Sequence, residues 1–76
     1  MYDEINIIRV IKQVERKFAG FSEEVKFMLE RGIEESTILY EIGYNISDYA
    51  NSEYATQNVN KLSEQVLSYF KSTYKH

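Results

Sequence analysis

Residues 40–54 combine tyrosines and carboxylates in a pattern that suits protein recognition. Tyrosine offers a large contact area with a polar tip, loses little conformational entropy on binding, and is enriched at protein interfaces. Carboxylates among the tyrosines favour a basic partner surface, including a groove that normally holds nucleic acid. We therefore predict a protein partner that contacts Tyr40, Tyr44, Asp48, Tyr49, Glu53 and Tyr54. The alternative is that two or three of these tyrosines close a small hydrophobic core.

Residues that commonly carry catalysis or bind metals are scarce in this chain. It contains no cysteine, and its one histidine is His76. It also lacks the glycine-rich phosphate-binding motif GxxxxGK[ST]. The adjacent carboxylates of Glu23 and Glu24, like those of Glu34 and Glu35, would point in different directions on a helix and form no acid–base pair. We predict that the protein is not an enzyme, and we expect no catalytic residue, cofactor or metal ion.

The charge distribution separates two kinds of partner. The formal net charge is −3, and most of the acidic residues fall between residues 20 and 56, where the basic residues are Lys26 and Arg31. A nucleic-acid-binding protein normally shows the opposite bias. The basic residues Arg9, Lys12 and Arg16 share one face of a predicted helix, where they would contact phosphates or simply lie in solvent. The sequence therefore favours a protein partner over nucleic acid.

The chain lacks proline, so its three glycines are the main expected helix ends. Apolar residues recur at helical spacing in every segment between these glycines. We predict an all-α fold, a small compact bundle of four to five helices with a helix-turn-helix-like centre, formed by residues 1–76 as a single helical domain. The expected helices cover about 3–19, 23–31, 34–42, 47–55 and 56–74, and the fourth is either separate or part of the fifth.

Several individual positions follow from this pattern. We expect Ser22 to cap the second helix, because serine is a favoured N-cap residue, and we expect Gly43 to close the third. Phe27 falls off the apolar side of the second helix, and we interpret it as a core residue rather than a partner-binding one. The other expected core residues include Ile7, Ile11, Val14, Phe18, Phe21, Val25, Met28, Leu29, Ile33, Ile38, Leu39, Ile42, Val59, Leu62 and Val66.

Residues 22–54 resemble the helix-turn-helix motif of many bacterial and phage regulators. The sequence Ile38-Leu39-Tyr40-Glu41-Ile42-Gly43 occupies the frame of the first helix, with Gly43 at the turn. The resemblance implies that residues 46–54 form a recognition helix that enters the major groove. The chain departs from the motif at Leu39, where alanine is usual, and in that helix, which carries Asp48 and Glu53 without any lysine or arginine.

These observations support one functional hypothesis and one alternative. We predict a non-enzymatic regulatory or inhibitory protein that acts through protein–protein interaction, and the alternative is a small helix-turn-helix DNA-binding regulator. The sequence is rich in Ile, Asn, Tyr and Lys, whose codons are AT-rich, which is typical of low-GC bacteria and of their phages and mobile elements. With neither a signal peptide nor a long apolar run, we predict a cytoplasmic protein without membrane association. Its short length leaves a homodimer open as a further means of stabilisation.

Overall fold

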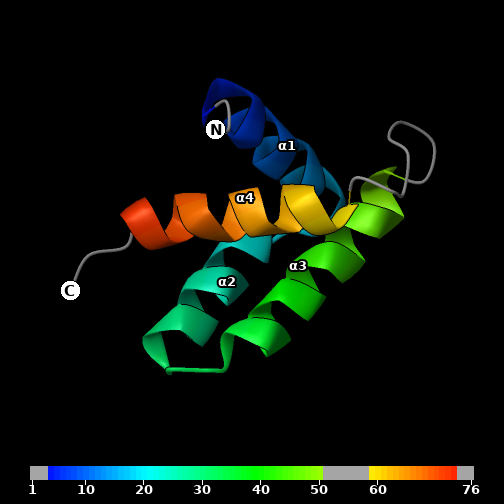
Figure 1. Ribbon diagram of the computed structural model, residues 1–76. Coiled ribbons are helices and arrows are strands. Elements are labelled where there is room, and N and C mark those ends of the chain that lie inside the picture. The colour runs from blue at the N-terminus through cyan, green and yellow to red at the C-terminus, as the bar shows by residue number, and fades with distance from the viewer. Residues whose placement is uncertain (1–3, 51–58, 74–76) are drawn as a thin grey trace.

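The structure, a computed structural model, describes residues 4–50 and 59–73, and the side chains of 4–47 and 59–73. These residues form four helices and no strand (Figure 1): α1 (Glu4–Lys17), α2 (Phe21–Glu30), α3 (Glu35–Ala50) and α4 (Val59–Thr73). The predicted all-α class is therefore confirmed, with four helices in the described part of the chain.

Helix α4 lies across the other three helices and packs against each of them (Figure 1). Its most extensive contact is with α3. Every helix places an apolar stripe against a shared core, because helices this short depend on tertiary burial for their stability. The core consists of Ile7, Val10, Ile11, Val14, Phe21, Val25, Met28, Ile38, Ile42, Ile46, Val59, Val66, Leu67 and Phe70.

Helix α1 follows the predicted pattern closely. Glu4 lies in its first turn, and Arg16 and Lys17 lie in its last turn, which is the arrangement that the helix dipole favours. Three members of the predicted stripe are buried, and Phe18 is half-buried against the core just beyond the helix end. Val10, which the predicted stripe omitted, is fully buried as well.

The junction between α1 and α2 differs from the prediction at Ser22. Gly20 has a φ of +90°, a conformation that glycine adopts most easily, and it precedes α2 directly. Helix α2 therefore begins at Phe21, one residue before the expected cap, and Ser22 lies inside its first turn. The backbone N–H of Ser22 donates a hydrogen bond to the carboxylate of Glu15 on α1. An acceptor from the preceding helix thus performs the role that we assigned to the serine hydroxyl.

Helix α2 ends in a Schellman motif at Gly32, which has a φ of +74°. The N–H of Gly32 donates to the carbonyl of Leu29 at 3.2 Å, and the N–H of Ile33 donates to the carbonyl of Met28 at 3.0 Å. This turn leaves Ile33 41% exposed, so the prediction that Ile33 re-enters the core is wrong. The interpretation of Phe27 as a core residue is also wrong, because its side chain is 53% exposed on the outer side of α2.

Helix α3 continues through Gly43, so the predicted helix end at that residue is wrong. Consequently Ser47 caps no helix, and residues 47–50 belong to α3 rather than to a separate helix or to the last one. A glycine inside a helix costs about 1 kcal/mol relative to alanine. Burial of Ile38, Ile42 and Ile46 on the inner side of α3 outweighs this cost, since each buried isoleucine contributes roughly 1.5–3 kcal/mol.

The continuation of α3 through Gly43 also bears on the helix-turn-helix resemblance of residues 38–43. Gly43 has helical neighbours on both sides, whereas the motif requires a turn there. The turn that the resemblance places at Gly43 is therefore absent, and the predicted helix-turn-helix centre within residues 22–54 is not confirmed. The turn that does occur in this part of the chain lies at residues 31–34, between α2 and α3.

Candidate partner-binding surface

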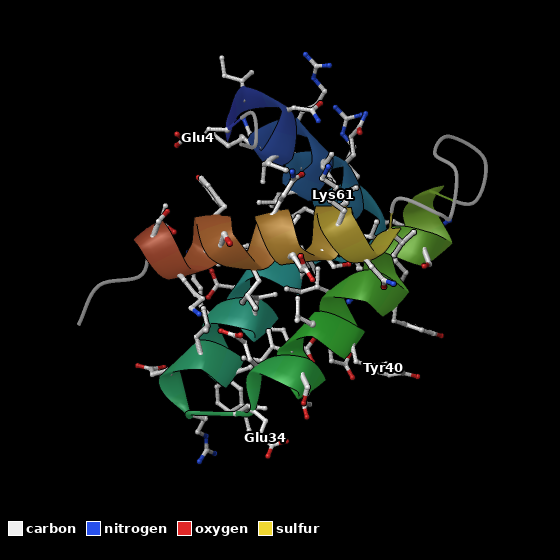
Figure 2. All side chains as sticks on the ribbon, in the orientation of Figure 1. Glu4, Glu34, Tyr40 and Lys61 are labelled. Carbon is white, nitrogen blue, oxygen red and sulfur yellow. The ribbon has the colours of Figure 1, made fainter. Side chains whose placement is uncertain are left out.

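Two of the predicted partner-binding tyrosines lie on the outer side of α3. Tyr40 is 71% exposed and Tyr44 is 64% exposed. They are four residues apart, so their side chains lie on the same side of the helix, one turn from each other. Figure 2 shows Tyr40 extending away from the helices into solvent. We call Tyr40 and Tyr44 the tyrosine ridge. Neither of them closes the core, and the alternative stays a prediction for Tyr49 and Tyr54, whose side chains lie outside the described residues.

A groove runs beside the tyrosine ridge, along the contact between α3 and α4. It consists of two adjoining cavities of about 300 Å³ and 230 Å³. The two cavities share Leu39, Tyr40 and Asn60 among their lining residues. Leu39 is half-buried and packs against the core, so it gives the groove an apolar surface close to two large aromatic rings. We call this hollow the α3–α4 groove.

The position of the groove depends on a close approach of the two helices at Gly43. A Cβ atom at this position would lie 3.2 Å from the Ser63 hydroxyl oxygen and 3.8 Å from a methyl carbon of Val59. Ser63 is buried, and its hydroxyl donates to the carbonyl of Val59 at 2.8 Å, so no polar atom is left unsatisfied there. A small residue on each helix therefore allows α4 to pack tightly behind the tyrosine ridge.

Carboxylates predominate among the charged residues near this surface. Glu64 lines the smaller of the two cavities of the α3–α4 groove. The half-buried Glu41 follows Tyr40 in α3. Glu35 forms an ion pair with Lys71 across the other end of the same helix contact. Lys61 leaves α4 on the side away from Tyr40 (Figure 2). The described part of this surface therefore presents aromatic rings together with negative charge.

The remaining predicted partner-binding residues are less fully described. Asp48 and Tyr49 belong to the last turn of α3, but their side chains lie outside the described residues. Glu53 and Tyr54 lie wholly outside the described residues. The structure thus brings together Tyr40 and Tyr44 and leaves the other four predicted positions untested.

The alternative phosphate-contacting residues lie on a different part of the molecule. Arg9, Lys12 and Arg16 are all exposed on α1, as their spacing predicts. They belong to a helix that forms no part of the α3–α4 groove. The basic face and the tyrosine ridge are therefore separate surfaces.

The prediction missed several residues that line the groove. Asn60 and Glu64 come from α4, and Gly43 and Ser47 come from α3. The sequence marks Gly43 as either a helix end or a site of close packing, and the local pattern does not decide between the two. No comparable signal indicates which polar side of α4 would face α3.

Two further properties concern the described residues alone. They contain no group of three or more His, Asp or Glu side chains arranged to hold a metal ion. None of the helices α1–α4 combines the length and the apolar character that a membrane span requires.

Comparisons with models of protein families, with curated proteins and with solved structures find no match to this chain.

Proposed function

We propose that this protein is a non-enzymatic regulatory or inhibitory protein that binds a basic surface of another protein through the tyrosine ridge and the α3–α4 groove. The exposure of Tyr40 and Tyr44 on adjacent turns of α3 is the observation that carries the proposal. Two large aromatic side chains that contribute little to the core have a clear use at an interface, where tyrosine is a preferred contact residue.

The shape of the surface supports the same proposal. An apolar residue at the base of the groove, Leu39, lies between the ridge and α4. Interfaces commonly combine such an apolar centre with a polar rim. The polar rim here is supplied by Asn60, Ser47 and Glu64. A partner side chain inserted beside Tyr40 would bury both its own apolar surface and that of the tyrosine ring.

Charge supports a basic partner. Glu41 and Glu64 adjoin the ridge and the groove, and the chain as a whole carries a formal net charge of −3. Opposite charges accelerate encounter and disfavour wrong partners, and both effects weaken as salt is added. We also propose a cytoplasmic site of action and an origin in a phage or another mobile element, on the basis of composition.

A pull-down with matched variants tests this proposal. Tagged wild-type protein, the double variant Tyr40→Ala/Tyr44→Ala and the control Ile5→Ala are incubated with lysate of the organism that carries the gene. Ile5 is also apolar and is 72% exposed, but it lies on α1. We expect the double variant to recover a stoichiometric basic partner about tenfold less well, since an interface hot spot contributes roughly 2 kcal/mol or more. Equal recovery by all three proteins would refute the proposed surface.

A further arm of the experiment separates the tyrosine ridge from Phe27, which is also an exposed aromatic residue in the described part of the chain. The guanidinium of Arg31 lies 4.9 Å from the centroid of the Phe27 ring, so this part of α2 presents an aromatic group together with positive charge. Recovery that falls with Phe27→Ala but not with Tyr40→Ala/Tyr44→Ala would assign the binding surface to α2. We expect the reverse.

DNA binding is the second candidate, supported by the exposed basic face of α1. Arg9, Lys12 and Arg16 would contact phosphates, whereas α3 cannot supply the turn that the motif places at Gly43. A gel-shift experiment on genomic fragments at low salt tests it. Retention that falls steeply with salt and is lost in the triple alanine variant would support DNA binding. Absence of any retention would eliminate it.

A further inference from the structure

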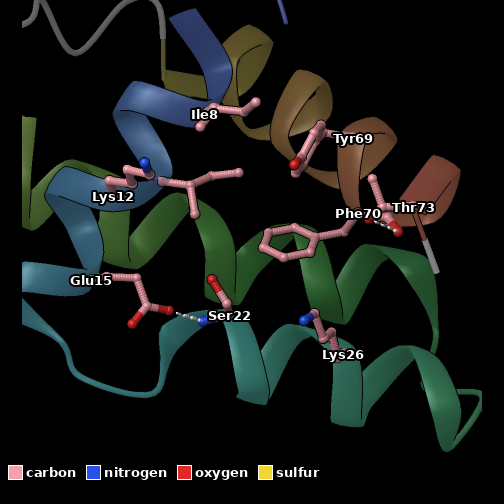
Figure 3. A pocket seen from close by; sticks show the side chains of 9 residues that line it. Ile8, Lys12, Glu15, Ser22, Lys26, Tyr69, Phe70 and Thr73 are labelled. Carbon is pink, nitrogen blue, oxygen red and sulfur yellow. Dashed lines mark hydrogen bonds between the residues drawn. The ribbon is translucent and has the colours of Figure 1, made fainter. Parts of the chain in front are cut away.

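A further cavity lies between α1, α2 and α4, away from the α3–α4 groove. Its volume is about 380 Å³, which is within the range of small-molecule sites, roughly 300–1,000 Å³. Figure 3 shows residues of α1, α2 and α4 on different sides of this cavity. We call it the α1–α2–α4 cavity.

One side of the cavity is apolar and partly aromatic. Ile8 and Ile11 come from α1, and Tyr69 and Phe70 come from α4. The two rings are in edge contact, with centroids 5.8 Å apart and an angle of 71° between their planes. The buried Phe70 ring is further fixed by an edge contact with Phe21. This apolar surface suits an aromatic ring or a short aliphatic chain.

The other side of the cavity is charged, and its charges do not cancel. Lys12 from α1 and Lys26 from α2 line it together with the single carboxylate of Glu15. Figure 3 shows the two lysines on different helices at the edge of the cavity, with Glu15 and Ser22 between them. Two ammonium groups and one carboxylate give the lining of the cavity one net positive charge.

The carboxylate of Glu15 already accepts hydrogen bonds from other residues of the protein. Burial tends to raise the pKa of Glu15, but hydrogen bonds from the hydroxyl and backbone N–H of Ser22 and from the backbone of Gly20 outweigh it. The positive charge of Lys26 adds to their effect, and the pKa of Glu15 is held below its ordinary value. Glu15 is thus ionised at neutral pH and partly balances Lys26. No salt bridge to a described carboxylate involves Lys12.

We propose that the α1–α2–α4 cavity binds a small amphipathic monoanion, a carboxylate with an aromatic or short aliphatic tail. The tail lies against Ile8, Tyr69 and Phe70, and the carboxylate accepts hydrogen bonds from the ammonium groups of Lys12 and Lys26. A monoanion matches the single excess positive charge, whereas a dianion would face the fixed negative charge of Glu15. Neutral analogues would lose the charge–charge attraction to the two ammonium groups.

Titration with a matched pair of probes tests the proposal. Amide chemical shifts of the full-length protein are followed by NMR during addition of 4-phenylbutyrate and, separately, of neutral 4-phenylbutyramide. We expect saturable shifts centred on Lys12, Lys26 and Phe70, and about tenfold weaker binding of the amide, since the amide carries no charge to attract the two ammonium groups. Equal binding of the two probes, or no saturable shift up to the solubility limit, would overturn the proposal.

Charge-matched variants give an independent readout. Lys12→Gln/Lys26→Gln removes two positive charges at the cavity, and Lys17→Gln/Lys61→Gln removes two exposed charges that do not line it. We expect the first variant to bind 4-phenylbutyrate about tenfold more weakly and the second to bind like the wild type at moderate salt. Equal loss in both variants would mean that net charge alone attracts the probe, and the assigned cavity would be wrong.

Discussion

The two sides of α3 both carry large side chains but have opposite surroundings. On the inner side, Ile38, Ile42 and Ile46 are completely or almost completely buried against the other helices. On the outer side, Tyr40 and Tyr44 are mostly exposed beside the α3–α4 groove. The inner side therefore supplies the stability of the bundle, and the outer side is available to a partner. Mutations that separate stability from binding test this difference.

The largest expected effect comes from the inner side. Ile42 has an exposed fraction of 0%, so Ile42→Ala removes buried methyl and methylene groups and leaves a cavity. We expect the free energy of unfolding to fall by about 2–5 kcal/mol, measured by urea denaturation. For a chain of this size such a loss approaches the whole stability. A change near zero would mean that the inner side of α3 is not the core that we describe.

Gly43 affects both sides of α3, because the absence of a side chain there allows α4 to pack close to the tyrosine ridge. Gly43→Val adds a branched side chain where even a Cβ atom would lie 3.2 Å from the Ser63 hydroxyl oxygen. We expect a loss of about 1–3 kcal/mol from overpacking, measured in the same denaturation experiment. A change near zero would contradict the close packing of α3 against α4 at this residue.

Glu15 provides a polar stability contact between α1 and the start of α2 that involves neither side of α3. Its pKa is lowered in the folded protein, so its contribution is present above the unfolded pKa and is lost as the pH falls through the folded pKa. We expect Glu15→Gln to reduce stability at neutral pH and to flatten the acid side of the pH–stability profile, measured by denaturation at several pH values. A variant profile parallel to that of the wild type would contradict this account. Partner recovery should not change.

The smallest expected effect on stability comes from the outer side. Tyr40→Ala and Tyr44→Ala remove rings that are mostly in solvent, so each should change the free energy of unfolding by less than about 0.5 kcal/mol. Denaturation of the two single variants measures this. A loss above about 2 kcal/mol from either one would show that the ring belongs to the core, and the contrast between the two sides of α3 would fail.

Much of the fold was predictable because the apolar spacing of α1 and α4 directly determines which side each helix buries. The left-handed glycines at positions 20 and 32 were predictable for the same kind of local reason. The role of Gly43 was not predictable from the sequence. A glycine in a helical pattern marks either a helix end or a close approach of another helix, and the choice depends on whether another helix packs against that residue. Only the tertiary contact with Ser63 decides it.

The candidate surface was predictable in part. Tyr40 and Tyr44 are exposed, as a partner-binding role requires, but the sequence alone left open that some of the four tyrosines close the core. Phe27 and Ile33 were misplaced, since hydrophobic residue type alone does not show that a Schellman turn directs Ile33 outward. The groove residues of α4 could not be predicted, because they depend on the rotation of α4 relative to α3.

The central claim is that the tyrosine ridge binds a protein partner, and the affinity of the purified partner for Tyr40→Ala/Tyr44→Ala tests it most directly. We predict a dissociation constant at least about tenfold above that of the wild type, with an unchanged helical circular dichroism spectrum. A dissociation constant equal to that of the wild type would contradict the claim.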